Sequence, residues 1–405
     1  MKTTILYATA MATIILLASF SNPAIQWGFY AHKTINRMAV FILPPEMLVF
    51  FKKHIDYLSV HATDPDKRRY VVEGEALKHF MDIDHWGTYP FENVPHRWED
   101  AYMKYLGIQI ITQNNDTFQL QNSGNEMDST VISTLGLEID NREFLYFAKK
   151  ELMSAFHEPH FRYPSDQLSW IKQSFIPVKE VLFDQHFTEH GILPYYINIQ
   201  CDKLVQAFKS GDKKRILRLA TDLGHYVADL HVPLHAAKNY NGQLTGQEGI
   251  HAFWESRLPE MFAEAQYNYF VGKAQYIPDI ERFAWNTLIE SNRLHHEVLT
   301  LERKIREQIP EDRQYAYEIR SNMVVRTPSE ELSEAYHKAL AGMVERRMQE
   351  SVLALGSLWL TAWINAGQPV LDSDPEMHWT AEDIKEMELL EQGYQSGKEL
   401  GRSCH

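Results

Sequence analysis

The feature of this sequence that most constrains its fold is a stretch in which histidines and acids recur at helical spacing. His225 is followed four residues later by Asp229, and His251 is followed four residues later by Glu255. On an α-helix such residues lie on one face, one turn apart. Each pair therefore predicts a helix that directs an imidazole and a carboxylate to the same point, which suits a zinc ion.

A further histidine stands between the two pairs. His235 follows Pro233, which we expect to end the first helix and to leave His235 just beyond its C-terminal end. These residues offer five ligands, which is more than one tetrahedral zinc ion takes. The pattern therefore favours a site for several metal ions over the alternative, a set of buried histidines paired with acids. His231 and the tandem pair His295-His296 are not expected to be ligands.

The rest of the chain is predicted to be mostly helical. Apolar residues recur at helical spacing in residues 36–57, 203–230, 279–308 and 330–366, with a break at Gly211. A stretch rich in Asn, Gln, Thr and Ser begins near residue 107, and we expect an insertion over about residues 107–185 with loops or short β structure. Residues 368–405 are acidic and predict a loosely attached tail with a short helix near 381–391.

The first 26 residues have the pattern of a secretory signal peptide. Lys2 is their only charge, and residues 5–20 are apolar or small over a length that is short for a membrane span. An uncleaved anchor is the alternative. Cleavage would leave a mature chain that begins at Trp27, has no stable membrane span and is secreted or periplasmic.

Composition narrows the possible ligands and partners. The chain has two cysteines among 405 residues, so a zinc site built on thiolates and a disulfide scaffold are both excluded. Its formal net charge of −14 argues against avid binding of duplex DNA, which requires basic side chains.

Further residues earlier in the chain complete a pattern that resembles the superfamily of zinc-dependent phospholipase C and single-strand, P1-type nucleases. That pattern is an N-terminal Trp, a nearby His, an Asp after a helix, His-Phe-x-Asp, His-x-x-x-Asp, a His, and His-x-x-x-Asp/Glu. The resemblance spans residues 27 to about 259 and is nearest to bacterial secreted phospholipase C-like proteins. Its positions are filled, in order, by Trp27, His32, Asp64, His79, His225, Asp229, His235, His251 and Glu255.

The resemblance implies an all-α, multi-helix domain over residues 27–367 with a cleft that holds three zinc ions. Asp229 would bridge two of them, and Asp64 and Asp229 would be the catalytic carboxylates. The implied ligands are Asp64, His79 and His225 for one zinc of the pair, His32 and the free amino group and carbonyl of Trp27 for the other, and His235, His251 and Glu255 for the third.

Two positions leave alternatives open. Asp66 competes with Asp64, which we prefer because it directly follows the Ala-Thr end of the expected helix. Glu255 resembles the phospholipase branch more than the nuclease branch, where Asp is usual.

The expected function is that of a phospholipase C-like phosphodiester hydrolase in which a zinc-bound hydroxide attacks phosphorus. Its substrate would be a phospholipid or another phosphodiester. A single-strand nuclease with the same metals is the close alternative, with single-stranded nucleic acid as its partner, and a non-catalytic zinc-binding module is the alternative of another class.

A second metal motif points to a different enzyme class. His186 and His190, with Glu189 between them, form the His-x-x-Glu-His pattern of inverted zincin proteases. Gly191 and Pro194 follow at once, so a helix would end on the second histidine. We therefore regard a metalloprotease as the weaker hypothesis.

Overall fold

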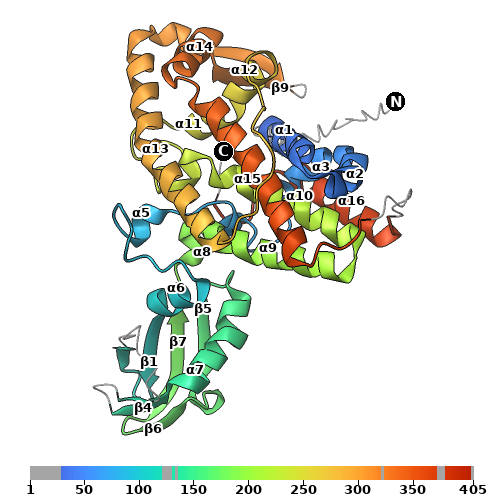
Figure 1. The fold of residues 1–405 in the computed structure, drawn as a ribbon. Coiled ribbons are helices and arrows are strands. Elements are labelled where there is room, and N and C mark those ends of the chain that lie inside the picture. The colour runs from blue at the N-terminus through green and yellow to red at the C-terminus, as the bar shows by residue number, and fades with distance from the viewer. Residues whose placement is uncertain (1–28, 121–129, 133–135, 321–322, 372–378, 403–405) are drawn as a thin grey trace, which may run out of the picture.

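The structure is a computed structural model that describes residues 29–120, 130–132, 136–320, 323–371 and 379–402. It is mostly helical, as predicted, with small sheets (Figure 1). The predicted signal peptide and Trp27 lie outside the described residues. Among the helices that are described, none combines the length and the apolar character needed to cross a membrane.

The N-terminal helices form one flank of the helical body. The helix expected over residues 36–57 is divided, because Pro44 and Pro45 interrupt it and Pro45 begins a new helix, where its missing N–H is tolerated. The structure has α1 (Phe29–Ala39), α2 (Pro45–Lys53) and α3 (Ile55–Val60) in this region.

Two long helices pack together in the body, and the second presents the His-x-x-x-Asp motif. They are α9 (Leu193–Ser210) and α10 (Lys213–Leu230), and Gly211 between them has a left-handed φ of 69°. Asp212 caps α10 by accepting a hydrogen bond from the backbone N–H of Arg215. Every residue from Leu223 to Leu230 is buried, so the polar groups in this part of α10 are surrounded by protein.

Two of the later helices, α13 (Ile280–Gln308) and α15 (Met343–Asn365), pack against this pair, and the other two lie above it in Figure 1. The single helix expected over residues 330–366 is two helices, because Gly342 takes a left-handed φ of 78° between them. The helices of this half are α12 (Leu258–Gln266), α13 (Ile280–Gln308), α14 (Glu330–Ala339) and α15 (Met343–Asn365), and a hairpin of β8 (Tyr315–Arg320) and β9 (Met323–Pro328) joins α13 to α14.

The predicted insertion is a separate lobe below the helical body in Figure 1. One sheet has the order β2-β1-β7-β5 and a second has the order β3-β4-β6. Trp170, Phe144 and Phe183 form the centre of its apolar packing. Its elements are β1 (Gly107–Thr112), β2 (Thr117–Leu120), β3 (Thr130–Ile132), β4 (Leu137–Asp140), α7 (Asn141–Phe147), β5 (His160–Pro164), β6 (Ile171–Ser174) and β7 (Val178–Asp184). Helices α6 (Trp98–Tyr105) and α8 (Phe187–His190) flank it along the chain.

The C-terminal region is docked on the body, which corrects the expectation of a loosely attached tail. Its helix α16 (Ala381–Ser396) extends beyond the expected bounds 381–391. Glu391 pairs with Lys67 at 2.9 Å and Asp383 pairs with Lys214 at 2.7 Å. The acids that suggested a solvated tail therefore face basic side chains of the body.

Candidate metal centre

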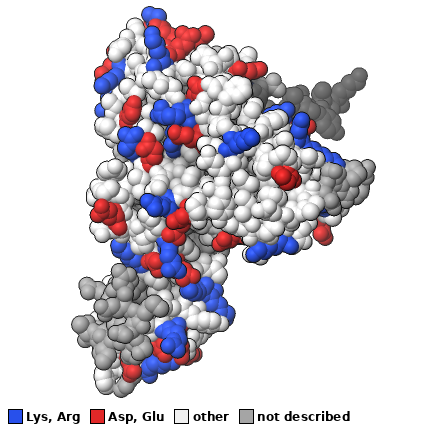
Figure 2. Space-filling model, in the orientation of Figure 1, with Lys and Arg blue, Asp and Glu red and all other residues white. Residues whose placement is uncertain are grey.

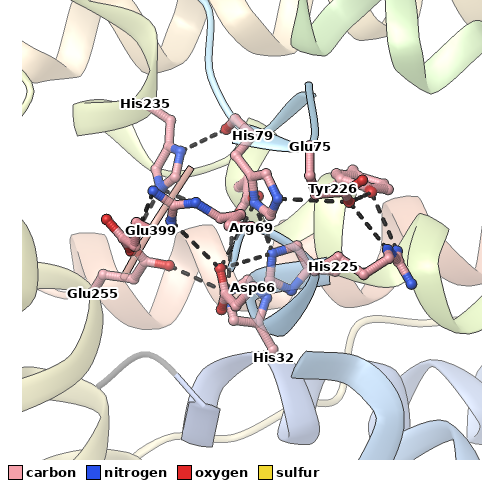
Figure 3. A network of polar contacts seen from close by, with 12 residues as sticks. His32, Asp66, Arg69, Glu75, His79, His225, Tyr226, His235, Glu255 and Glu399 are labelled. Carbon is pink, nitrogen blue, oxygen red and sulfur yellow. Dashed lines mark hydrogen bonds and ion pairs between the residues drawn. The ribbon is translucent and has the colours of Figure 1, made fainter. Parts of the chain in front are cut away.

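Five histidines and three acids from distant parts of the chain converge in the interior of the helical body (Figure 3). All eight residues are buried. His32 lies on α1, Asp66 on α4 (Asp64–Arg68), His79 directly after the turn Ala76–Lys78, His225 and Asp229 on α10, His235 in the turn Pro233–Ala236, His251 on α11 (Ile250–Ala252), and Glu255 in the π-helical turn Phe253–Arg257.

A close approach of α1 to α10 brings the first of these residues together. Asn36 on α1 donates hydrogen bonds to the carbonyls of Leu58 and Thr221. A Cβ on Gly224 would lie 1.6 Å from the Asn36 Oδ1, so only glycine permits this approach. The next residue on α10 is His225, whose ring stacks on that of His32 with centroids 4.0 Å apart.

One group of ligand atoms surrounds the Asp229 carboxylate. Its Oδ2 is 3.0 Å from His79 Nδ1 and 3.3 Å from His225 Nε2, and these two nitrogens are 3.0 Å apart. The predicted His-x-x-x-Asp pair thus directs both side chains to one point, and His79 meets them there.

A second group lies where the chain turns after α10. Glu255 Oε2 is 2.8 Å from His251 Nε2 and 3.2 Å from His235 Nε2, and the two nitrogens are 3.1 Å apart. The predicted helix through His251 and Glu255 has a π-helical turn at Glu255. Such single turns are frequent at functional sites.

His32 connects the two groups. Its Nε2 is 3.6 Å from Asp229 Oδ1 and 3.3 Å from Glu255 Oε1. The four overlapping sets whose ligand atoms lie within 4.8 Å of one another are His32-Asp66-His225, His79-His225-Asp229, His235-His251-Glu255 and His32-Asp229-Glu255.

Hydrogen bonds outside the cluster orient two of its imidazoles. His225 Nδ1 is 2.9 Å from the Ala62 carbonyl, and His235 Nδ1 is 2.6 Å from the His79 carbonyl. A carbonyl accepts only, so each Nδ1 carries a proton and each Nε2 is the ring nitrogen that faces the cluster. This is the orientation that metal-ligating histidines take.

The charges of the cluster favour a cation at its centre. Burial opposes charge on His225 and His235, but Asp229 and its neighbouring carboxylates outweigh this effect and raise both pKa values. Burial lowers the pKa of His79 to about 4, so that imidazole is neutral. Buried carboxylates are costly unless a positive charge compensates them. The residues therefore suit metal ions, which would supply that charge.

Asp66 belongs to the cluster, which corrects the preference for Asp64. Asp66 Oδ1 is 3.5 Å from His225 Nε2. Asp64 points elsewhere, since its Oδ2 lies 2.7 Å from His61 Nδ1. On the short helix α4 these residues are two positions apart, so their side chains project in different directions.

Arg69 ends the basic run Lys67-Arg68-Arg69, for which the sequence favours a solvated turn over a contact with phosphate. It is buried one turn after Asp66, and its Nη1 is 3.8 Å from Asp66 Oδ1. Its charge offsets part of the negative charge of the three carboxylates. An acid and an arginine three residues apart on a helix lie on the same face, and this spacing could have indicated that Arg69 pairs with Asp66.

His231 is buried outside the cluster, as expected. Its Nδ1 is 2.7 Å from the Val227 carbonyl. The backbone carbonyl of His231 accepts a hydrogen bond from Arg347 Nε. Burial, aided by the Arg347 charge, lowers the pKa of His231 to about 3.

This histidine predicts a measurable pH dependence of stability. The unfolded side chain binds a proton near pH 6.5, whereas the folded one resists it down to about pH 3. Its contribution is therefore complete above pH 6.5 and is lost as the pH falls, by up to about 1.4 kcal/mol per pH unit. Urea unfolding of the metal-free protein and its His231→Gln variant should show a shallower slope for the variant between pH 6.5 and 4. Equal slopes would contradict this role.

The protease-like motif and the tandem histidines do not join the cluster. Glu189 is exposed, and the helix that carries it, α8, has four residues. His190 instead stacks on His85, with centroids 3.5 Å apart, and its Nδ1 is 3.1 Å from Asp82. His295 Nε2 is 3.0 Å from the Asn239 carbonyl, outside the cluster.

No protein-family model, curated protein sequence or solved structure matches this chain. The buried groups could still hold metal ions, because imidazole nitrogens and carboxylate oxygens converge in each of them. This donor set suits zinc and other first-row metals.

Proposed function

We propose that this chain is a zinc-dependent phosphodiester hydrolase that binds three zinc ions and resembles the phospholipase C and P1-type nuclease superfamily. The observation that carries the proposal is the buried convergence of five imidazoles and three carboxylates, with pairs of ring nitrogens 3.0 and 3.1 Å apart. Two lone pairs that face each other so closely repel unless a proton or a metal ion lies between them.

The chain's own residues divide naturally among three ions. Asp229 reaches the ligands of two of the proposed ions, since its Oδ2 faces His79 and its Oδ1 faces His32. It is therefore the proposed bridging ligand and the central carboxylate of the reaction site. One proposed set is His79, His225 and Asp66, whose ligand atoms lie within 3.8 Å of one another. The second is His32 with Asp229, to which the resemblance adds Trp27, and the third is His235, His251 and Glu255.

Bound zinc would supply a water molecule with a pKa near 7 and would polarise a phosphoryl oxygen. Around it, the chain holds the ligands in fixed tautomers through the Ala62 and His79 carbonyls. Arg69 places a positive charge beside Asp66, where it can attract an anionic oxygen. These contributions suit hydrolysis of a phosphodiester.

A phospholipid or a small phosphodiester is favoured over a nucleic acid. Over the face in Figure 2, basic and acidic side chains are interspersed on the described residues and form no continuous basic band. Binding of single strands generally uses a basic groove with stacking aromatics. The net charge of −14 points the same way.

Turnover of three substrates tests the proposal. The purified, zinc-loaded protein is given phosphatidylcholine, single-stranded DNA and a chromogenic phosphodiester, beside a His235→Ala variant that controls for contaminating hydrolases. We expect hydrolysis of the chromogenic diester and of the phospholipid. Hydrolysis of DNA alone would favour the nuclease. No turnover at full zinc occupancy would favour a zinc-binding module and contradict an enzyme.

The proposal also places the protein outside the cytoplasm, with the mature chain beginning at Trp27. The backbone nitrogen of Trp27 can bind zinc well only as a free α-amino group, since an amide nitrogen is not basic. A form with residues 1–26 or a tag before Trp27 is therefore expected to bind fewer zinc ions and to turn over poorly. Mass spectrometry of the N-terminus, set beside zinc counts of both forms, checks this. An extended form with three zinc ions and full activity would exclude the role of Trp27.

A further inference from the structure

The last described residues of the chain run beside the metal centre. We call Gly397 to Arg402 the C-terminal strap. The backbone N–H of Leu400 donates to the Arg69 carbonyl at 2.8 Å, and Arg69 Nη2 donates to the Arg402 carbonyl at 2.6 Å. Arg69 is thus the residue that joins the strap to the cluster.

The strap also brings an acid to this position. Glu399 Oε1 is 3.6 Å from Arg69 Nη2 and accepts a hydrogen bond from the Tyr70 hydroxyl at 3.1 Å. Figure 3 shows Glu399 among the side chains of the cluster. A carboxylate and a backbone carbonyl therefore contact Arg69 Nη2, a donor that could otherwise pair with an anionic ligand.

Arg402 fastens the strap to two segments that lie beside the cluster. Its guanidinium lies over the Phe80 ring at 3.8 Å and over the Tyr240 ring at 3.6 Å. Its Nη1 also contacts both oxygens of the buried Asp82 carboxylate, at 2.7 and 2.8 Å. Phe80 follows the cluster residue His79.

Tyr240 lies near the other group of ligands, that of His235, His251 and Glu255. The Tyr240 ring is 6.3 Å from that of His251. Arg402 therefore spans from the segment of His79 to the loop that packs on His251.

The strap and helix α16 are held to the body by different contacts. Gly397 and Gly401 take left-handed φ values of 70° and 100°, so the backbone bends at both ends of the strap. Helix α16 is held separately by its own ion pairs with Lys67 and Lys214. The strap could leave the site without loss of the helix before it.

We infer that the C-terminal strap is an autoinhibitory segment that occupies the approach to the metal centre and competes with an anionic substrate. The inference rests on the proposed function, because it takes the cluster to be the reaction site. The closed strap reduces the fraction of molecules that can bind substrate, and the apparent affinity falls by the same fraction. Release of the strap, by proteolysis or by a competing surface, would activate the enzyme.

The test compares the full chain with a chain that ends at Ser396 and with the point variants Arg402→Ala and Glu399→Gln. Lys398→Ala is the matched control, because Lys398 is an exposed residue of the same strap. Two quantities are measured: kcat/KM on a chromogenic phosphodiester, and the rate at which apoprotein takes up Co²⁺, followed by absorbance. We expect kcat/KM to rise about tenfold in the shortened chain and in Arg402→Ala, mainly through KM, with faster Co²⁺ uptake. Lys398→Ala should match the full chain.

The two measurements separate the inference from the proposed function. Faster Co²⁺ uptake with no turnover in any form would support the strap as a cover over the metal centre and would contradict the proposed phosphodiesterase activity. Turnover with an unchanged or lower kcat/KM on removal or release of the strap would overturn autoinhibition. If the shortened chain fails to fold, the point variants decide by the same criteria. Inhibition of the shortened chain by a peptide of residues 394–405 should be competitive, and a lack of inhibition at millimolar peptide would count against the inference.

Discussion

Replacement of Asp229 by asparagine is expected to remove more than one metal ion per chain and to lower phosphodiester turnover by roughly a thousandfold. Asparagine keeps the shape of the side chain but loses its charge and one acceptor oxygen. The Asp229 carboxylate lies 3.0 Å from His79, 3.3 Å from His225 and 3.6 Å from His32, so its loss affects the ligands of two ions.

Metal analysis and steady-state kinetics check this expectation. Asp222→Asn is the matched control, because Asp222 is on the same helix but pairs with Arg68 at 2.9 Å, outside the cluster. That variant should keep all its metal. Glu255→Gln should lose the ion held with His235 and His251 and retain the ion at His79 and His225. Equal losses from Asp229→Asn and Glu255→Gln would contradict the bridging role of Asp229.

The second large effect separates two acids that are two residues apart. Asp66→Asn is expected to lose one metal ion and at least about a hundredfold of activity, because Asp66 is 3.5 Å from His225 and belongs to the buried cluster. Asp64→Asn should retain its metal and change activity by no more than about twofold, since Asp64 contacts His61 instead.

This pair of variants carries its own control, because both replace an aspartate of α4 by the same residue. Zinc content and kcat/KM of the two purified proteins decide between them. If Asp64→Asn lost the metal and Asp66→Asn kept it, the position of α4 relative to the cluster would be wrong.

Regular spacing made part of this site predictable. The i, i+4 pairs require only a helix to bring their side chains together, and they do so at Asp229 and at Glu255. The helical spacing of apolar residues likewise predicted α10, α13 and the part of α9 from residue 203 onward, with the break at Gly211.

What the sequence did not predict depends on contacts between distant segments. The choice of Asp66 over Asp64 is decided by His61, which holds Asp64 away from the cluster. The docking of α16 is decided by Lys67 and Lys214, and local composition cannot reveal such partners. The β8–β9 hairpin was missed because its short strands lie between two long helical patterns.

Anomalous diffraction at the zinc edge, from crystals of the purified protein without chelator, tests the central claim most directly. Three peaks are expected inside the helical body: one among His79, His225 and Asp66, one among His235, His251 and Glu255, and one beside His32 and Asp229. All three should vanish below the edge. One peak or none at these residues, in protein supplied with excess zinc, would contradict a trinuclear zinc centre.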